Sequence, residues 1–127
     1  MHAIIIEESL VDKSVLKKHK IIRTKFLPEP TNWRLHIVEL YGSLNEAITE
    51  IQYSMVSDNP FYFHVYDDGK TLVVVFKNNY FSLDPNNKIT WVDARVYGNR
   101  LGIPDKQLDF FPTKISEEEI WLNKNSN

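Results

Sequence analysis

The 127-residue sequence contains no cysteine. This absence excludes disulfide scaffolds, cysteine-ligated zinc or iron–sulfur sites and thiol nucleophiles. Glycine is also scarce, and its four residues never form a G-x-G-x-x-G or Walker arrangement. We therefore expect no backbone cradle for the phosphates of a dinucleotide or nucleoside triphosphate, because such cradles need glycine at fixed spacing.

Long apolar runs and a strong charge imbalance are missing as well. No window approaches the roughly 18 apolar residues that read as a membrane-spanning helix. The formal charge is −2, from 15 basic and 17 acidic side chains, so no strong field attracts nucleic acid or lipid. Residues 1–8 have no basic region and only a short apolar run, which indicates a strand rather than a signal peptide. We expect a cytoplasmic protein without a membrane partner.

The residues that are present have a balanced globular composition, with 43% hydrophobic and 25% charged side chains. This balance predicts a folded domain rather than a disordered chain. We expect one domain over residues 1–112 and a C-terminal tail over 113–127. Acidic residues at 117–119 favour the start of a short helix in that tail, because acids belong in the first turn of a helix.

The spacing of apolar residues predicts the elements of the first half and one later helix. Strands are expected at 3–7, 20–27 and 33–41, and helices at 10–19, 44–56 and 91–101. Ser9 with Asp12 and Ser43 with Glu46 have the spacing of helix-capping boxes. Gly98 lies inside the last helix, where glycine costs about 1 kcal/mol relative to alanine, so we expect close packing there.

The most informative stretch runs from residue 61 to residue 83. Asp68-Gly69 separates two strand patterns, and this dipeptide favours a two-residue hairpin turn with positive φ at both positions. Asn78-Asn79 offers a second turn, which would pair Phe76 with Phe81. These hairpins predict an α+β single domain with a mostly antiparallel sheet of five or six strands, whereas an α/β fold would need parallel strands and crossovers. We expect its two main helices, 44–56 and 91–101, to pack on one face.

The predicted turn at Asp68-Gly69 also assigns each side chain to a face of the sheet. Phe63, Val65, Leu72 and Val74 would share the core face, and strand 33–41 would place its histidine on the second face. The candidate ligand or partner face therefore consists of Arg34, His36, Tyr62, His64, Tyr66, Val73 and Val75. An amphipathic and partly aromatic surface of this kind is typical of one that meets a ligand, a partner or a terminal segment.

We expect the protein to be a non-enzymatic binding or protein-interaction module that uses this face for a small molecule or a protein. We predict no catalytic residue, metal or cofactor, since His36 and His64 lack a metal-ligand spacing. A small enzyme with a His/Tyr site is one alternative. The basic cluster at 17–25 leaves nucleic-acid binding as the other, although lysines that guard an edge strand explain it equally well, and we do not expect a nucleic-acid partner.

The second face also bears on self-association. If both main helices lie on the core side, no element before residue 103 covers Val73 and Val75. Either the tail around Ile120–Leu122 folds over this face or a second copy does. A twofold homodimer is the commonest assembly of identical chains, and we expect one here.

Two stretches carry a resemblance to small uncharacterised prokaryotic proteins. One is residues 91–104, WVDARVYGNRLGIP, followed by residues 107–110, QLDF, which resemble the C-terminal part of those proteins. The other is residues 60–66, PFYFHVY. The resemblance implies no activity, cofactor or catalytic residue, so it assigns no role to any position of this chain.

Overall fold

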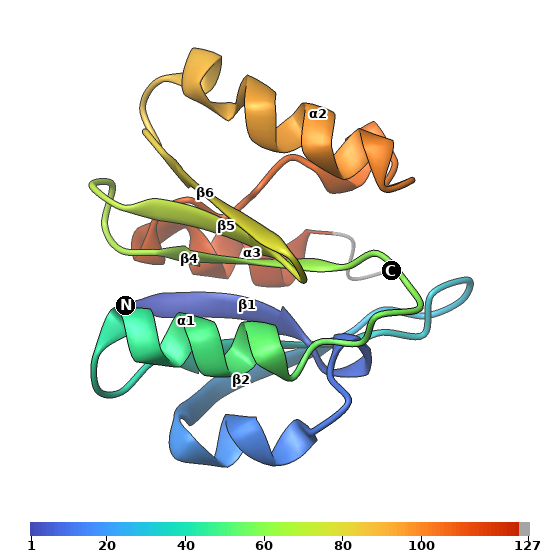
Figure 1. The fold of residues 1–127 in the computed structure, drawn as a ribbon. Coiled ribbons are helices and arrows are strands. Elements are labelled where there is room, and N and C mark those ends of the chain that lie inside the picture. Colours follow the sequence, from blue (N-terminus) through green and yellow to red (C-terminus); the bar gives the residue numbers. More distant parts are fainter. Residues whose placement is uncertain (125–127) are drawn as a thin grey trace.

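The computed structural model of the protein describes residues 1–124. They form a six-stranded sheet in which each strand runs antiparallel to its neighbours, in the order β2-β3-β1-β4-β5-β6 (Figure 1). The strands are β1 (His2–Ile6), β2 (Lys20–Phe26), β3 (Arg34–Glu39), β4 (Tyr62–Tyr66), β5 (Leu72–Phe76) and β6 (Asn79–Leu83). This architecture confirms the predicted α+β single domain with an antiparallel sheet.

Helices connect and cover the strands. The α-helices are α1 (Leu44–Tyr53), α2 (Val92–Arg100) and α3 (Glu118–Asn123), and the 3₁₀ helices are η1 (Glu7–Ser9), η2 (Lys13–Lys18), η3 (Lys88–Trp91), η4 (Asp105–Gln107) and η5 (Ile115–Glu117). The α-helix expected over 10–19 is instead the shorter η2, which Asp12 caps in place of Ser9. Ser43 caps α1 as predicted, accepting the N–H of Glu46. No helix of the described chain is long and apolar enough to cross a bilayer.

The hairpin between β4 and β5 forms, but its turn is longer than the two residues predicted. Tyr66 and Leu72 are the last paired residues, which leaves five residues between the strands. A two-residue type I′ turn needs a positive φ at both central positions, and Gly69 has one (105°) whereas Asp68 does not. The Asp67 carboxylate instead accepts two backbone N–H groups of the loop and holds it in the longer form.

This longer loop shifts the pairing by one residue and exchanges the faces of β5. Val73 and Val75 oppose Val65 and Phe63, so they share the face of those two residues, where the prediction had placed Leu72 and Val74. The predicted placement of Val73 and Val75 on a face opposite Phe63 is therefore wrong. The next turn also differs, because Phe76 pairs with Asn79. A shift of two residues keeps Phe81 on the same face as Val74 and Phe76, as predicted, so β6 changes face together with β5 relative to Phe63.

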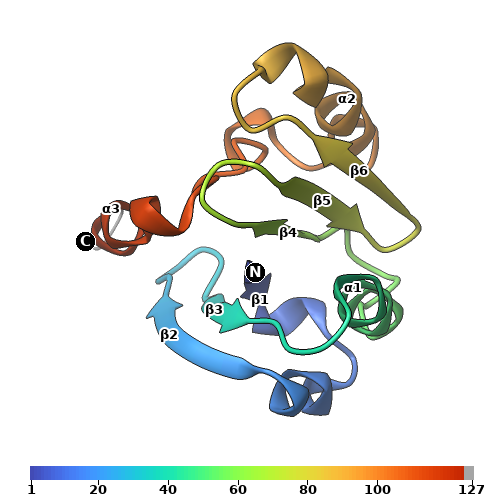
Figure 2. The same ribbon diagram turned by 90° about the vertical axis from the view of Figure 1, so that its left-hand side faces the viewer.

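The two main helices lie on opposite faces of the sheet, which corrects the prediction that both pack on one face. In Figure 2, α1 and α3 lie on either side of the sheet, with α2 above β5 and β6. Helix α1 and η2 cover the face of Phe63, Val73 and Val75. Helix α2 and the C-terminal segment (residues 103–124) cover the face of Val74 and Phe76.

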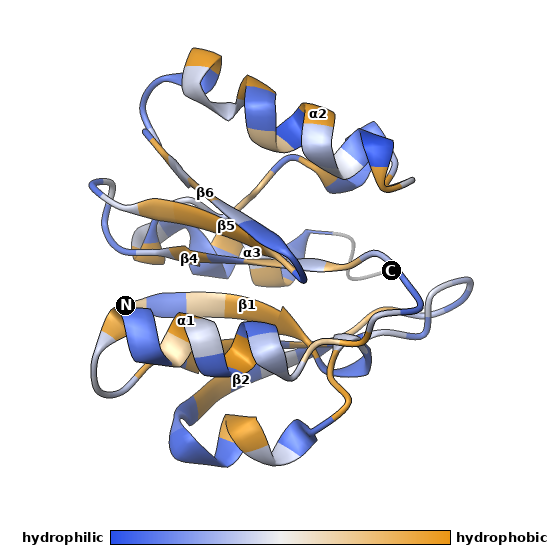
Figure 3. Ribbon diagram, in the orientation of Figure 1, coloured by the Kyte–Doolittle hydropathy of each residue, from blue (hydrophilic) through white to orange (hydrophobic). Residues whose placement is uncertain are grey.

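The strand β5 explains why both faces must be covered. All five of its residues, Leu72–Phe76, are buried, and Figure 3 shows it as a continuous apolar ribbon between the helices. A strand without alternation is typical of one buried on both faces. The run of apolar residues was therefore a better guide to burial here than the turn sequence was.

Gly98 allows the C-terminal segment to pass close to α2, as its position in the sequence suggested. A Cβ atom at residue 98 would lie 2.7 Å from Cδ2 of Leu108 and 3.4 Å from the ring of Phe76. Since well-packed interiors have no room for an additional methyl group without strain, Gly98 fixes how close α2 and Leu108 can come.

Candidate functional site

The structure divides the predicted ligand or partner face into three groups. Val73 and Val75 belong to the core beneath α1. His36 pairs with Ile5, whereas His64 pairs with the adjacent Ile4, and adjacent residues of a strand point to opposite faces. The two histidines therefore lie on opposite faces. Arg34 and His36 lie on one side, and Tyr62, His64 and Tyr66 lie on the other.

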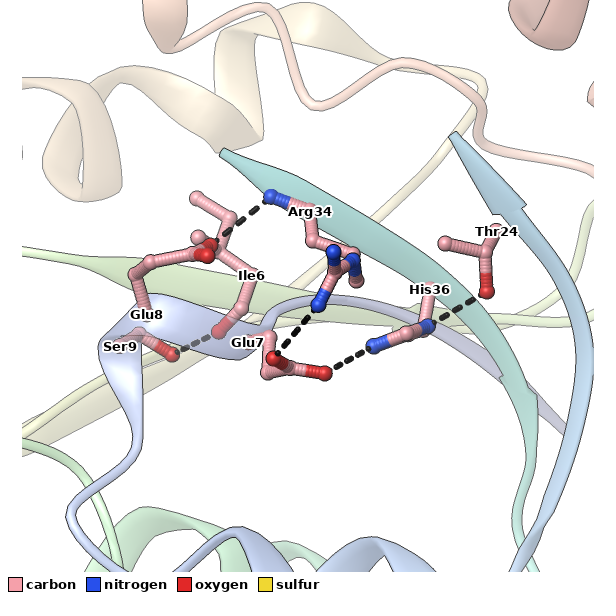
Figure 4. Close-up of polar contacts among 7 residues, drawn as sticks. All are labelled: Ile6, Glu7, Glu8, Ser9, Thr24, Arg34 and His36. Carbon is pink, nitrogen blue, oxygen red and sulfur yellow. Dashed lines mark hydrogen bonds and ion pairs between the residues drawn. The ribbon is translucent and has the colours of Figure 1, made fainter. Parts of the chain in front are cut away.

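His36 is the centre of a polar chain that ties three segments together (Figure 4). Its Nδ1 atom lies 2.7 Å from Oγ1 of Thr24, and its Nε2 atom lies 2.9 Å from Oε1 of Glu7. The guanidinium of Arg34 contacts the other oxygen of Glu7 at 3.3 Å. The hydrogen bond with His36 and the charges of His36 and Arg34 outweigh burial and hold the pKa of the Glu7 carboxyl below its usual value.

A hydroxyl, an imidazole and a carboxylate in a row are also the parts of a nucleophilic triad. Here the row joins β2, β3 and η1 on the face opposite the cavity described below, and His36 is buried. We therefore interpret it as a structural tie. Sequence reasoning missed Glu7 and Thr24, because their approach to His36 depends on strand pairings that no local motif indicated.

The opposite face contains a cavity of about 200 Å³ between the sheet and the C-terminal segment. Its floor comes from three neighbouring strands and includes Ile4, Ile6, Leu35, Tyr62 and His64. Strands lie about 4.8 Å apart, so one helix about 10 Å wide cannot cover six of them. Helix α2 covers the β5–β6 side, and the irregular C-terminal segment covers the rest incompletely.

Aromatic side chains form much of the wall of the cavity, and charged groups line it as well. Trp33 and Phe61, whose ring centroids are 5.6 Å apart, line it together with Phe111 and Trp121 of the C-terminal segment. The charged residues that line the cavity are Lys25, Lys106, Lys124 and Asp109.

The polar side chains of the floor are bound to backbone carbonyl groups of the C-terminal segment. The hydroxyl of Tyr62 donates to the carbonyl of Gln107. His64 Nε2 donates to the carbonyl of Pro112 at 2.8 Å. Burial lowers the pKa of His64 to about 4, and burial, with Asp109 nearby, raises the pKa of the Tyr62 hydroxyl. At neutral pH both rings are therefore uncharged, and both serve as donors.

Tyr66 lies on the same face but outside the cavity. Its hydroxyl donates to Oε2 of Glu118 at 2.6 Å, and Nδ1 of His2 lies 2.7 Å from the same oxygen. Burial and the neighbouring carboxylate of Glu118 raise the pKa of Tyr66. This group fastens α3 to β1 and β4.

The basic cluster at 17–25 is partly used within the chain. The ammonium of Lys25 donates to the carbonyl groups of Trp121, at 2.7 Å, and of Lys124, and burial lowers its pKa. Arg23 contacts Glu119 at 3.4 Å. Lys18 pairs with Glu50 of α1 at 2.7 Å. These contacts give three of the cations a role in joining elements of the fold.

The C-terminal tail covers the side of the sheet that holds Tyr62, His64 and Tyr66, which is one part of the face that the sequence had left open. Its expected short helix is α3, and the Trp121 side chain is 9% exposed within the core cluster of that face. Residues 125–127, the end of the predicted tail, lie outside the described residues. Because α1 and the tail cover Val73, Val75 and Tyr66, the homodimer loses the uncovered face that motivated it and stays an untested prediction.

Within residues 1–124, no three histidine, aspartate or glutamate side chains gather as a metal site would require. Comparisons with models of protein families, with curated proteins and with solved structures found no match.

Proposed function

We propose that this protein is a non-enzymatic binding protein that holds a small molecule in the cavity between the sheet and the C-terminal segment. The observation that carries this proposal is the cavity itself, about 200 Å³ in volume with an aromatic wall and a floor that includes Tyr62 and His64. An apolar cavity of about 150 Å³ is enough to bind benzene. A ring-sized ligand therefore fits this one.

The protonation states of His64 and Tyr62 on the cavity floor favour binding over acid–base catalysis. A general acid or base works best with a pKa near the working pH. The pKa of His64 is about 4, and its Nε2 hydrogen is already donated to Pro112. Both His64 and Tyr62 thus have fixed hydrogen bonds rather than protons to exchange at neutral pH.

A larger and more open hollow of about 460 Å³ lies between η2 and α1. It is a weaker candidate because its principal charged groups, Lys18 and Glu50, pair with each other at 2.7 Å. Its lining residues also include only one aromatic side chain, Tyr53. Few groups of this hollow remain to recognise a ligand.

The three tryptophans offer a direct test of the cavity. Trp33 and Trp121 line it, whereas Trp91 lies at the end of η3, directly before α2, and donates its indole N–H to the carbonyl of Asp84 at 2.8 Å. In a fragment screen followed by ¹H–¹⁵N NMR, we expect bound fragments to shift the indole signals of Trp33 and Trp121 and to leave Trp91 unchanged. A screen whose hits move only Trp91, or which yields no hits at millimolar concentration, would contradict the proposal.

A matched pair of variants locates the binding site. Leu35→Trp places a larger side chain on the floor of the cavity and should abolish fragment binding. Leu101→Trp makes the same chemical change at an exposed position outside the cavity and should leave binding unchanged. Circular dichroism checks that both variants fold, and equal binding by both would place the ligand elsewhere.

Two further properties are proposed on sequence grounds alone. We place the protein in the cytoplasm, because a chain without cysteine needs no oxidising compartment for its fold. The homodimer remains a prediction that size-exclusion chromatography with light scattering would test.

A further inference from the structure

We propose that the cavity selects small anions with a flat, ring-sized apolar body, of which an aromatic carboxylate is the simplest example. This inference rests on the proposed binding function and adds the chemical class of the ligand. Three observations carry it, namely the positive charges that line the cavity, the absence of ion pairs at its lysines within residues 1–124, and the aromatic wall.

The charges that line the cavity are mostly positive. Three ammonium groups, from Lys25, Lys106 and Lys124, stand against the single carboxylate of Asp109. That carboxylate accepts the backbone N–H of Phe111 at 3.3 Å. Since the whole chain carries a formal charge of −2, a net positive cavity is a local feature rather than a reflection of the composition.

None of these three lysines forms an ion pair within residues 1–124. Lys25 donates to carbonyl groups, which orient its ammonium but do not neutralise it. The Lys124 ammonium lies 5.2 Å from the ring centre of Phe111, a cation–π contact that also leaves the charge in place. Elsewhere Lys18 and Arg34 do pair with carboxylates. A ligand anion would supply the counter-charge that the chain itself does not.

The shape and wall of the cavity set the rest of the ligand. A volume of about 200 Å³ exceeds the roughly 150 Å³ that holds benzene by about the space of a carboxylate, so a ring with one small substituent fits. The rings of Trp33 and Phe61 are tilted by 59° and lie 5.6 Å apart, and an aromatic ligand gains from offset or edge-to-face packing against such rings in addition to the burial of its apolar area.

Four probes of related structure separate charge from apolar body. Benzoate carries both features, benzamide keeps the ring without charge, benzylamine reverses the charge, and acetate keeps the charge without the ring. Titration of each probe into the full chain, followed by the indole signals of Trp33 and Trp121, gives the four affinities. We expect benzoate to bind roughly tenfold more tightly than benzamide, since two or three exposed ion pairs have about this combined effect. We expect acetate and benzylamine to bind more weakly than benzamide.

The outcomes distinguish this inference from the function beneath it. Benzamide or benzylamine binding as tightly as benzoate would overturn the anionic class and leave the binding function standing. Acetate binding as tightly as benzoate would overturn the requirement for a ring. If no probe moves either indole signal at millimolar concentration, both the ligand class and the binding function fail.

A pair of lysine variants tests the origin of the charge preference. Lys106→Gln removes one exposed ammonium of the cavity that makes no ion pair within the described chain, and should reduce the preference for benzoate over benzamide about threefold. Lys70→Gln, in the exposed β4–β5 loop, makes the same change away from the cavity and should have no effect. The preference should also shrink at high salt, because the Debye length falls from about 10 Å at 0.1 M to about 3 Å at 1 M. An unchanged preference in Lys106→Gln at low salt would contradict the proposed role of this residue.

Discussion

The two faces of the sheet are covered in different ways. Beneath α1 the side chains are almost all apolar, as with Phe63, Val65 and Val75. On the opposite face His64 and Tyr66 are buried and Tyr62 is half-buried among apolar residues, and each donates a hydrogen bond to the C-terminal segment. The first face is closed by α1 and η2, whereas the second is closed by α2 together with a C-terminal segment that has little regular structure.

This difference has a physical reason. The carbonyl groups inside a helix are already bonded to its own N–H groups, so a regular helix offers few partners to buried polar side chains. An irregular segment has free carbonyl groups, and buried donors need such partners to avoid a desolvation cost. Tyr62 and His64 thus specify where the C-terminal segment lies. The incomplete cover that results leaves the cavity.

The largest effect is expected from a charge beneath α1. Val75 is fully buried there, so Val75→Lys should lower the free energy of unfolding by about 4 kcal/mol or leave the chain unfolded, because an unpaired charge cannot be buried cheaply. Val11→Lys, at a side chain that is 74% exposed, is the control and should change stability little. Urea denaturation measures both, and a stable Val75→Lys variant would contradict the pairing of β4 with β5.

The second prediction concerns the cover of the opposite face. Trp121→Ala should lower the free energy of unfolding by about 3 kcal/mol, since it removes a large and mostly buried side chain. It should also weaken ligand binding, because Trp121 lines the cavity. Ile120→Ala, at the neighbouring and 62% exposed position, is the control in the same helix. Equal stabilities of the two variants would show that α3 does not pack on the sheet.

The third prediction uses the buried histidine. Burial holds the pKa of His64 at about 4 in the folded chain, below its ordinary value of 6.5. The unfolded chain therefore binds a proton between these values and the folded chain does not, so stability falls as the pH is lowered through this range. Between pH 7 and pH 5 we expect a loss of about 2 kcal/mol from this group.

The variant His64→Gln isolates this contribution. Its amide can still donate to the carbonyl of Pro112 but does not titrate in this range. Urea denaturation of both proteins at pH 7 and pH 5 should show the larger loss only in the chain that retains His64. Equal losses would mean that His64 is accessible to water and is protonated in the folded state.

The smallest effect is expected from one hydroxyl group. Tyr66→Phe removes the donor to Glu118 and should lower the free energy of unfolding by about 1 kcal/mol. Tyr80→Phe makes the same change at a side chain that is 62% exposed and should have no measurable effect. Thermal unfolding compares the two variants, and identical midpoints would show that this hydrogen bond does not hold α3.

The parts of the fold that could be predicted depend on local signals. Ser43 and Glu46 identified the start of α1, and the hairpins of residues 61–83 identified an antiparallel sheet. The register of the first hairpin could not be predicted, because the Asp68-Gly69 dipeptide also suits the longer loop that the Asp67 carboxylate stabilises. The pairing of β4 with β5 differs from the predicted one by one residue, and this difference places Val73 and Val75 on the face of Phe63.

The candidate site was only partly visible in the sequence. Tyr62 and His64 were identified because the alternation of their strand placed both of them on the second face. Trp33, Lys106 and Trp121 were missed as cavity residues, because they come from segments far apart in the sequence that only the tertiary fold brings together. The sequence left open whether the tail or a second copy covers the second face. The tail covers the side that holds Tyr62 and Tyr66, whereas α1 covers Val73 and Val75.

The most direct test of the account is to locate a ligand by anomalous scattering. Crystals of the protein soaked in 4-bromobenzoate would show a bromine peak wherever the probe binds. The account predicts a peak inside the cavity, near Trp33 and Trp121, with the carboxylate directed toward the lysines that line it. A peak only in the hollow between η2 and α1, or no peak in the cavity at a concentration that saturates binding in solution, would contradict it.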